Sequence, residues 1–345
     1  MSVQREQASS RRGRRRRLAI TRELVDGEFV YRDRGRKIVR RSELERIEAL
    51  AIPPAWSEVE ISRSPSAKVL ARGVDAAGRV QAVYHPSFRK RQDRRKYERL
   101  ERFGRALPRL RAQVDRDLRR RRLGRDRVTA CAVRLIDLQL FRVGNARYAE
   151  AHRSYGVTTL RREHIEVSGE AAIFDFKGKS GRRHRRRVRD ARVARLLSRL
   201  HDGLPGPELF AYLDDADAVR PLRSDDVNAY LKRYMGKGFT AKDFRTWGAT
   251  VLVATALLDL EAGELASQKQ RAVAVRDAVR KAAEMLGNTP AVTRSSYVDP
   301  RVLGAAEHPR VLARVRGSRA RMRGRRHLGV DEQATLALLA ATRNG

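Results

Sequence analysis

The chain has 345 residues, which suits two domains with tails, and 77 Lys and Arg against 41 Asp and Glu give it a formal net charge of +36. So much self-repulsion indicates a polyanionic partner such as DNA or RNA, because contact with phosphates releases condensed counterions. No apolar run is long enough to cross a bilayer and no secretory signal is visible, so we expect no membrane partner. Cys131 is the only cysteine, which excludes a disulfide framework and a cysteine-based zinc site within one chain and favours a cytoplasmic location, at the nucleoid.

The first hundred residues divide into a tail and a small domain. Residues 1–20 are rich in Arg, Ser and Gly, which predicts a disordered basic arm that either contacts DNA or only solubilises the chain. Residues 21–100 read as a β-rich N-terminal domain that binds DNA. Its signals are a turn at 52–56 and three strands, at 59–61, 68–71 and 80–84, with a hairpin turn at 75–78 between the last two.

Residues 101–345 are expected to form a mostly α-helical catalytic domain that contains a three-stranded β element, so that the fold class is α+β. Helical spacing covers 87–118 and 127–141, with a further short helix that stops at Gly156. Strands are predicted at 164–167 and 172–176, and the densely basic 182–188 reads as either a strand or a helix. The rest is predicted to be helical, including 240–258 after a capping box, 267–287 before a glycine cap, a short helix from Pro290 that carries Tyr297, and 330–341.

Cleavage of a phosphodiester without a metal needs a nucleophile, cations around the non-bridging oxygens and an acid for the leaving oxygen. The acidic pairs at 214–215 and 225–226 have no supporting motif for the alternative, a two-metal nuclease. The triplet at 178–180 matches only the end of a Walker-type loop, which argues against an ATP-driven motor. Taken singly, Arg142, Lys179, Arg245 and Tyr297 are more often surface charges or a core tyrosine than catalytic groups.

Together, however, these residues lie in four segments that resemble the motifs of type IB DNA topoisomerases, in family order and with family-like spacing. The segments are Phe141-Arg142-Val143-Gly144-Asn145 with Tyr148 and Gly156 downstream, Phe176-Lys177-Gly178-Lys179, Lys242-Asp243-Phe244-Arg245-Thr246-Trp247-Gly248, and Leu286-Gly287-Asn288-Thr289-Pro290 with Ser296-Tyr297. The resemblance is to the small poxvirus and bacterial branch. It extends upstream through Ile52-Pro53-Pro54-Ala55-Trp56 and Gly78-Arg79-Val80-Gln81, so it covers nearly the whole chain beyond the arm.

The resemblance implies a monomeric enzyme that closes as a clamp around double-stranded DNA and relaxes supercoils without ATP, metal or another cofactor. Tyr297 would attack the scissile phosphate and form a 3′-phosphotyrosine, and Lys179 would protonate the 5′-oxygen, either alone or together with Arg142. Arg142 and Arg245 would hold the non-bridging oxygens with their planar guanidiniums, and Asn288 completes the implied catalytic set. The implied DNA-binding residues are Arg79, Gln81, Tyr84, Asn145, Arg147, Tyr148 and Lys242.

Two positions depart from the poxvirus pattern. Asn288 stands where that pattern has a histidine; an amide can donate a hydrogen bond to a phosphoryl oxygen but cannot carry a positive charge. Ala82 stands where the poxvirus strand has an aromatic residue that contacts DNA. We therefore expect an active enzyme without the strict pentapyrimidine preference of the poxvirus enzymes.

Two other functions remain open at this point. A tyrosine recombinase or integrase would use the same chemistry, but it usually shows a different arginine motif and a helical N-terminal domain. A non-enzymatic DNA-binding protein would explain the charge but not the ordered set of motifs.

Overall fold

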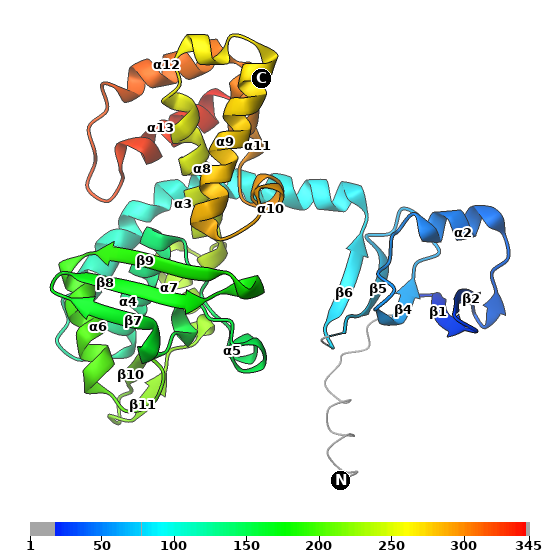
Figure 1. Cartoon of the computed structure of the whole chain (residues 1–345), viewed down its shortest axis with the longest axis horizontal. Coiled ribbons are helices and arrows are strands. Elements are labelled where there is room, and N and C mark those ends of the chain that lie inside the picture. Colours follow the sequence, from blue (N-terminus) through cyan, green and yellow to red (C-terminus); the bar gives the residue numbers. More distant parts are fainter. Residues whose placement is uncertain (1–17, 77, 343–345) are drawn as a thin grey trace. The chain divides into compact units, whose positions relative to one another are not determined.

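The computed structural model describes residues 18–76 and 78–342 (Figure 1). The chain divides into two compact units, Met1–Lys96 and Tyr97–Gly345, which we call the N-terminal and the C-terminal unit. The predicted arm lies outside the described residues except for its last three, and the first strand already begins at Ile20. The border predicted at residue 100 and the border between the units both fall within one helix, α3 (Pro86–Leu118).

The N-terminal unit is built on one antiparallel sheet in the order β3-β2-β1-β4-β5-β6. Its elements are β1 (Ile20–Val25), β2 (Glu28–Asp33), β3 (Arg36–Lys37), α2 (Arg41–Glu48), β4 (Ser57–Ile61), β5 (Val69–Val74) and β6 (Val80–Tyr84). A small core of Ile20, Ile47, Val59, Ile61 and Ala71 joins the sheet to α2. The strands predicted at 59–61, 68–71 and 80–84 are confirmed as β4, β5 and β6.

The C-terminal unit is mostly helical and contains a three-stranded antiparallel sheet, β7-β8-β9. Its helices are the rest of α3, α4 (Arg125–Gln139), α5 (Ala146–His152), α6 (Ala191–Gly203), α7 (Ser224–Met235), α8 (Ala241–Leu258), α9 (Gln268–Leu286), α10 (Pro290–Ser296), α11 (Pro300–Gly304), α12 (Pro309–Arg319) and α13 (Val330–Ala341). The sheet strands are β7 (Ile165–Ser168), β8 (Ala171–Lys177) and β9 (Arg183–Arg189). The predicted α+β fold is therefore confirmed.

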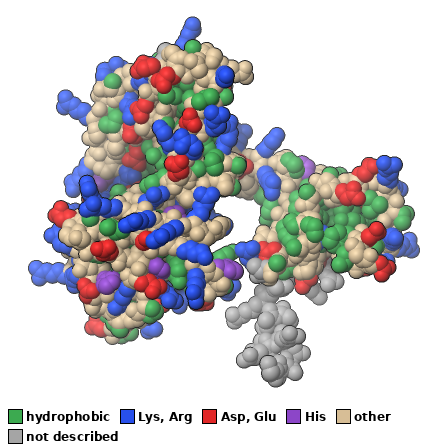
Figure 2. Space-filling model, viewed as in Figure 1, with side chains coloured by type: hydrophobic (Ala, Val, Ile, Leu, Met, Phe, Trp, Pro, Cys, Tyr) green, Lys and Arg blue, Asp and Glu red, His purple; other side chains and the backbone are tan. Residues whose placement is uncertain are grey.

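The sheet and the helix α8 organise this unit (Figure 1). The helices α4 and α6 contact the sheet, and α8 contacts α4, α9, α12 and α13. Along β9 the side chains alternate, with His184 and Val188 buried and Arg183, Arg185, Arg187 and Arg189 exposed, so the ambiguous basic segment is a strand with an arginine-rich outer face. Figure 2 shows Lys and Arg side chains spread over this part of the surface.

One expectation for this unit was wrong. The chain after β9 was predicted to be helical throughout, yet β10 (Ala211–Leu213) and β11 (Val219–Pro221) form a two-stranded antiparallel sheet. Each strand has only three residues, too few for an alternating pattern to stand out in the sequence. The pairing is supported by the turn between the strands, where the Asp214 carboxylate accepts hydrogen bonds from the backbone N–H groups of Ala216 and Ala218 at 3.0 Å.

The helix ends follow the predicted capping signals. The Asp243 carboxylate accepts a hydrogen bond from the Thr240 backbone N–H at 2.8 Å, and the Ser267 hydroxyl accepts one from the Gln270 N–H at 3.2 Å. Gly287 ends α9 in the left-handed conformation, with φ 61°. Within residues 18–76 and 78–342 no helix combines the length and apolarity needed to cross a membrane, and no cluster of His, Cys, Asp and Glu suits a metal ion.

Candidate active site

Arg142 is positioned by the way α4 ends. Leu140 adopts the left-handed conformation, with φ 53°, and turns the chain sharply after the helix. Phe141 then enters the core, where its ring contacts Phe174 and Phe176 at centroid distances of 5.7 and 5.2 Å. This anchored aromatic fixes the backbone immediately before Arg142, whose side chain is partly buried.

Arg245 lies in the first turn of α8 and is only 4% exposed. Its Nη1 donates a hydrogen bond to the Leu140 carbonyl, and its Nη2 donates to the Leu286 carbonyl at 3.0 Å. The guanidinium thus joins the end of α4 to the end of α9. Close approach of α8 to Leu140 depends on Gly248, because a Cβ there would come within 2.4 Å of a Leu140 methyl carbon.

Asn288 and Tyr297 flank the short helix α10. The Asn288 Oδ1 accepts a hydrogen bond from the Arg142 Nη2 at 2.7 Å. Tyr297 is the C-terminal cap of α10, and its ring centroid lies 5.2 Å from the Arg245 guanidinium carbon. The Thr250 hydroxyl donates to the Tyr297 carbonyl at 3.4 Å and accepts from the Asp299 N–H at 3.1 Å, so α8 also holds the backbone that carries the phenol.

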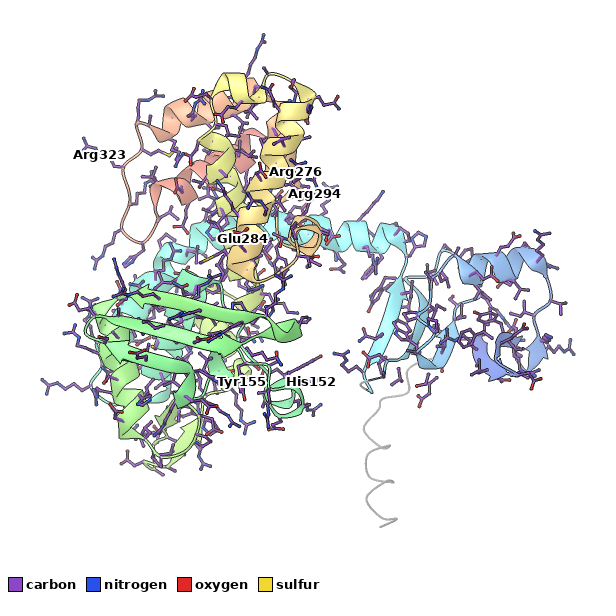
Figure 3. The ribbon with its side chains drawn as sticks, viewed as in Figure 1. His152, Tyr155, Arg276, Glu284, Arg294 and Arg323 are labelled. Atoms are coloured by element: carbon purple, nitrogen blue, oxygen red, sulfur yellow. The ribbon has the colours of Figure 1, made fainter. Side chains whose placement is uncertain are left out.

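The structure thereby brings together four of the five predicted catalytic residues, Arg142, Arg245, Asn288 and Tyr297. In Figure 3, Glu284 marks the end of α9 and Arg294 marks α10, the two helices between which Asn288 lies. Since these residues are separated by up to 155 positions in the chain (297 minus 142), tertiary packing assembles the cluster.

The cluster is strongly electropositive. Burial, followed by the nearby Arg142, lowers the pKa of Arg245 to about 10, and burial also lowers the pKa of Arg142. Burial alone would raise the pKa of the Tyr297 phenol, but Arg245, Arg142 and Asn288 outweigh it and lower that pKa. Neither Arg142 nor Arg245 forms an ion pair with a carboxylate of the described residues.

Two buried donors in this cluster have no hydrogen-bond partner among the described residues, the Asn288 Nδ2 and the Arg245 Nε. A buried donor without an acceptor is costly, and such atoms in native proteins usually mark a functional site. Donors beside two guanidiniums and a phenol suit a ligand with several anionic oxygens, such as a phosphodiester.

Lys179, the fifth predicted catalytic residue, is not part of this cluster. It is exposed at the tip between β8 and β9, in a short 3-10 turn (Lys179–Gly181), and its side chain has no hydrogen bond or ion pair with the described residues. The base of this tip is fixed by a 2.7 Å hydrogen bond from the Gly178 N–H to the Arg182 carbonyl. We call residues 177–183 the lysine hairpin.

The predicted DNA-binding residues fall into two groups. In the N-terminal unit, the Gln81 Nε2 and the Arg79 Nε donate to the Asp75 carboxylate at 2.9 and 2.8 Å, and the Tyr84 ring lies 5.3 Å from the Phe88 ring. In the C-terminal unit the predicted DNA-binding residues are all exposed; they are Asn145, Arg147, Tyr148 and Lys242. Asn145 caps the start of α5 and Tyr148 lies in its first turn; Figure 3 marks His152 at the end of this helix and Tyr155 in the segment after it. No contact in the structure tests their role.

His184 is a residue of this site that the sequence reading did not single out. It is 7% exposed and lies among Arg142, Arg245, Arg182 and Arg186. Burial and these guanidiniums lower the pKa of His184 to about 4, so that its ring is neutral at neutral pH. The signal available in the sequence was a histidine at an inward position of an alternating, otherwise arginine-rich strand.

The sequence matches two models of known protein families. Residues 85–306 match the family "Eukaryotic DNA topoisomerase I, catalytic core", and residues 28–75 match "Bacterial DNA topoisomerase IB, N-terminal domain". The "DNA topoisomerase 1B" of Acanthamoeba polyphaga mimivirus is 31% identical over 81% of this chain and 84% of its own length. The "DNA topoisomerase 1B" of vaccinia virus (strain Western Reserve) is 20% identical over 75% and 80%, whereas the match to the "DNA topoisomerase 1" of Mycosarcoma maydis covers 48% of this chain and only 18% of that protein. Because the two family models match in order along the chain and the mimivirus enzyme is similar over most of both sequences, the chain belongs to the type IB DNA topoisomerases.

Proposed function

We propose that this enzyme relaxes supercoiled DNA by cutting one strand through Tyr297, allowing the duplex to swivel and resealing the break, as a monomer that closes around double-stranded DNA. The observation that carries the proposal is the convergence of Arg142, Arg245, Asn288 and Tyr297 in one buried, positively charged cluster. The clamp and the monomeric state rest on the family resemblance and on the net charge of +36.

In the cleavage step the Tyr297 phenolate attacks the scissile phosphorus in line. A P–O bond to tyrosine forms while the bond to the 5′-oxygen breaks. The lowered pKa of Tyr297 favours loss of its proton before or during attack. The products are a 3′-phosphotyrosine and a 5′-hydroxyl, and reversal of the same step reseals the strand. The ester stores the energy of the broken bond, so resealing needs no ATP.

The guanidiniums and the amide stabilise the charge that builds on the non-bridging oxygens. Arg245 is held in place by two backbone carbonyls before any substrate arrives, so little reorganisation accompanies the reaction. Its Nε and the Asn288 Nδ2 are donors with no partner among the described residues, and both suit these oxygens. Asn288 also orients Arg142 by accepting its Nη2 hydrogen bond.

The departing 5′-oxygen needs a proton, and we assign its delivery to Lys179. The lysine is exposed on a hairpin adjoining the cluster through His184, and its amine can lose a proton far more readily than a guanidinium can. In this proposal DNA binding brings the lysine hairpin against the leaving group, as apo sites often tighten only with substrate.

The decisive experiment uses a suicide DNA substrate that traps the cleaved state, followed by denaturing gel analysis and mapping of the linked peptide. The expected result is protein joined to the 3′ end of the broken strand through Tyr297, also in EDTA and without nucleotide. Tyr297→Phe should form no adduct and relax no plasmid. Relaxation by Tyr297→Phe, or linkage at another residue, would overturn the proposal, and a need for paired recombination sites would identify a recombinase instead.

A further inference from the structure

His184 occupies the junction between the lysine hairpin and the rest of the active site. It lies on β9 directly opposite Phe176 of β8, and its ring stacks on the Phe176 ring at 5.1 Å with an interplanar angle of 25°. The Phe141 ring meets it edge-on at 6.0 Å. Two aromatic rings thus hold the imidazole in one orientation.

Two glycines make room for this imidazole. Gly178 precedes Lys179, and a Cβ at Gly178 would lie 2.6 Å from both Nε2 and Cδ2 of His184. Gly287 precedes Asn288, and a Cβ there would lie 2.6 Å from His184 Cε1. The ring therefore touches the backbone immediately before the lysine and the backbone immediately before the asparagine.

The charge around His184 argues against a role in proton transfer. The groups that face it are Arg182 and Arg186 of its own hairpin and strand, Arg142 from the segment after α4 and Arg245 from α8, and all four are cationic. Its ring nitrogens have no hydrogen bond with the described residues. A neutral ring in this place fills space without adding a further positive charge to the cluster.

We propose that His184 is a positioning residue: by keeping Gly178 and Gly287 apart, its ring sets where the lysine hairpin stands relative to the phosphate-binding cluster. This inference rests on the proposed role of Lys179 as the acid. It predicts that loss of the ring lets the hairpin settle and misplaces Lys179, while Arg245 and Tyr297 keep their own supports.

The first test measures single-turnover cleavage by His184→Ala on two substrates, one ordinary and one with sulfur in place of the 5′-bridging oxygen. A thiolate leaves without protonation, so this substrate does not need the acid. We expect His184→Ala to cleave the ordinary DNA up to about a hundredfold more slowly, as misplacement by about 1 Å can cause, and to cleave the sulfur substrate at close to the wild-type rate. His184→Phe, which keeps a ring between the glycines, should retain most of the ordinary rate.

The second test uses the contact itself. Gly178→Ala should slow cleavage because the added methyl group meets the His184 ring, and combining it with His184→Ala should recover part of that loss because the space is then open. Gly169→Ala, in the turn between β7 and β8, is the control: its φ of 56° strains any side chain, but no atom lies within 4 Å of the added methyl group, so His184→Ala should not rescue it. Simple additivity of Gly178→Ala and His184→Ala would overturn the inference.

The outcomes separate this inference from the function on which it rests. If Lys179→Ala is not rescued by the sulfur substrate, Lys179 is not the acid and the proposed mechanism fails. If Lys179→Ala is rescued but His184→Ala stays slow on both substrates with an unchanged melting temperature, only the positioning role is wrong. If His184→Ala does not fold, two measurements with His184→Phe still test the positioning role. His184→Phe should cleave both substrates at close to the wild-type rates, and combining it with Gly178→Ala should not restore the rate lost in Gly178→Ala, because a ring still occupies the space.

Discussion

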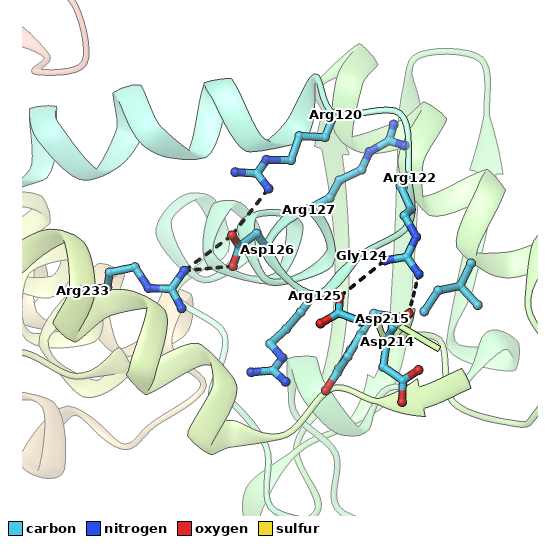
Figure 4. Close-up of a pocket in the computed structure, with 11 residues that line it drawn as sticks. Arg120, Arg122, Gly124, Arg125, Asp126, Arg127, Asp214, Asp215 and Arg233 are labelled. Carbon is cyan, nitrogen blue, oxygen red and sulfur yellow. Dashed lines mark hydrogen bonds and ion pairs between the residues drawn. The ribbon is translucent and has the colours of Figure 1, made fainter. Parts of the chain in front are cut away.

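Two arginine clusters of the C-terminal unit differ in how their charge is balanced. The first lines a cavity of about 360 Å³ between α4, α7 and the β10–β11 sheet (Figure 4). Four of its five arginines have carboxylate partners, among them Arg122, which pairs with Asp217 at 2.7 Å, and Arg233, which pairs with Asp126 at 3.2 Å. The fifth, Arg127, donates to the Arg121 carbonyl. Most of the guanidiniums in this cavity therefore have their charge balanced by a carboxylate.

The second cluster is the proposed active site, where Arg142 and Arg245 pair with no carboxylate of the described residues and donate instead to an amide and to backbone carbonyls. These acceptors hold the guanidiniums in place but leave their net charge available to a phosphate. In a chain with 77 Lys and Arg residues, the number of basic side chains that line a cavity therefore does not by itself indicate anion binding. What distinguishes the proposed active site is the Arg245 guanidinium, which belongs to a residue only 4% exposed and has no carboxylate partner among the described residues.

The largest effect is expected from Arg245→Ala. Loss of an arginine that stabilises the transition state of phosphoryl transfer costs about 10³–10⁵-fold in rate, and single-turnover cleavage would show it. Arg245→Lys keeps the charge but not the planar fork, so it should recover only part of the rate. If Arg245→Ala cleaved DNA at close to the wild-type rate, the contrast between the two arginine clusters would have no functional meaning.

A partly buried arginine that does have carboxylate partners should matter for stability instead. Arg111 donates to Asp137 at 2.7 and 2.8 Å and to Glu332 at 2.7 and 2.9 Å, and so joins α3, α4 and α13. Arg111→Met leaves two carboxylates without their partner, which should lower the free energy of unfolding by about 3–5 kcal/mol. Chemical denaturation is the measurement, with Arg121→Met, an exposed arginine, as the control; equal stability of the two variants would contradict the prediction.

The surplus of positive charge around the active site also predicts a pH effect. His184 has an unfolded pKa near 6.5 and a folded pKa of about 4, so below 6.5 the unfolded chain takes up a proton that the native protein resists. The stability associated with the neutral ring is fully present above 6.5 and is lost as the pH falls to about 4, up to about 3 kcal/mol. The free energies of unfolding of wild type and His184→Phe, measured between about pH 7 and pH 4, should therefore converge or cross as the pH falls. A constant difference between the two free energies would show that the ring does not resist protonation.

The smallest effect is expected in the cavity of Figure 4. Arg122 is exposed and its ion pair with Asp217 lies in solvent, where such pairs contribute little. Arg122→Ala should leave both the cleavage rate and the melting temperature unchanged within error. A large loss of cleavage would mean that arginines with carboxylate partners also hold DNA, and the contrast between the two clusters would need revision.

Much of the helical architecture was predictable because its boundaries are written in local signals. Ser267 and Gly287 bracket α9, and the range predicted for the last helix, 330–341, is that of α13. The elements that the sequence did not place are either short, as β3 and the β10–β11 pair are, or have almost no buried side chains to mark an inward face, as is true of β1 and β2. Their pairing depends on neighbours far along the chain, which no local pattern contains.

The site shows the same division. The motifs predicted which residues carry the chemistry, and four of the five converge. The contacts that hold these residues together were not predictable. Leu140 adopts the left-handed conformation although it is not a glycine, so the sequence does not signal the turn. The His184 ring lies between Gly178 and Gly287 only because β8, β9 and the end of α9 meet in the fold. Lys179 remains a prediction, since its place depends on the substrate.

The contact between Gly248 and Leu140 restricts how this sequence can vary. A methyl group at position 248 would push α8 from the turn after α4 and so change the separation of Arg142 and Arg245 without touching either one. A chain altered there would still carry every charged group to which we assign DNA binding, yet it would hold the phosphate between misaligned guanidiniums. A single added carbon could thus turn a strand-cutting enzyme into a protein that only coats the duplex.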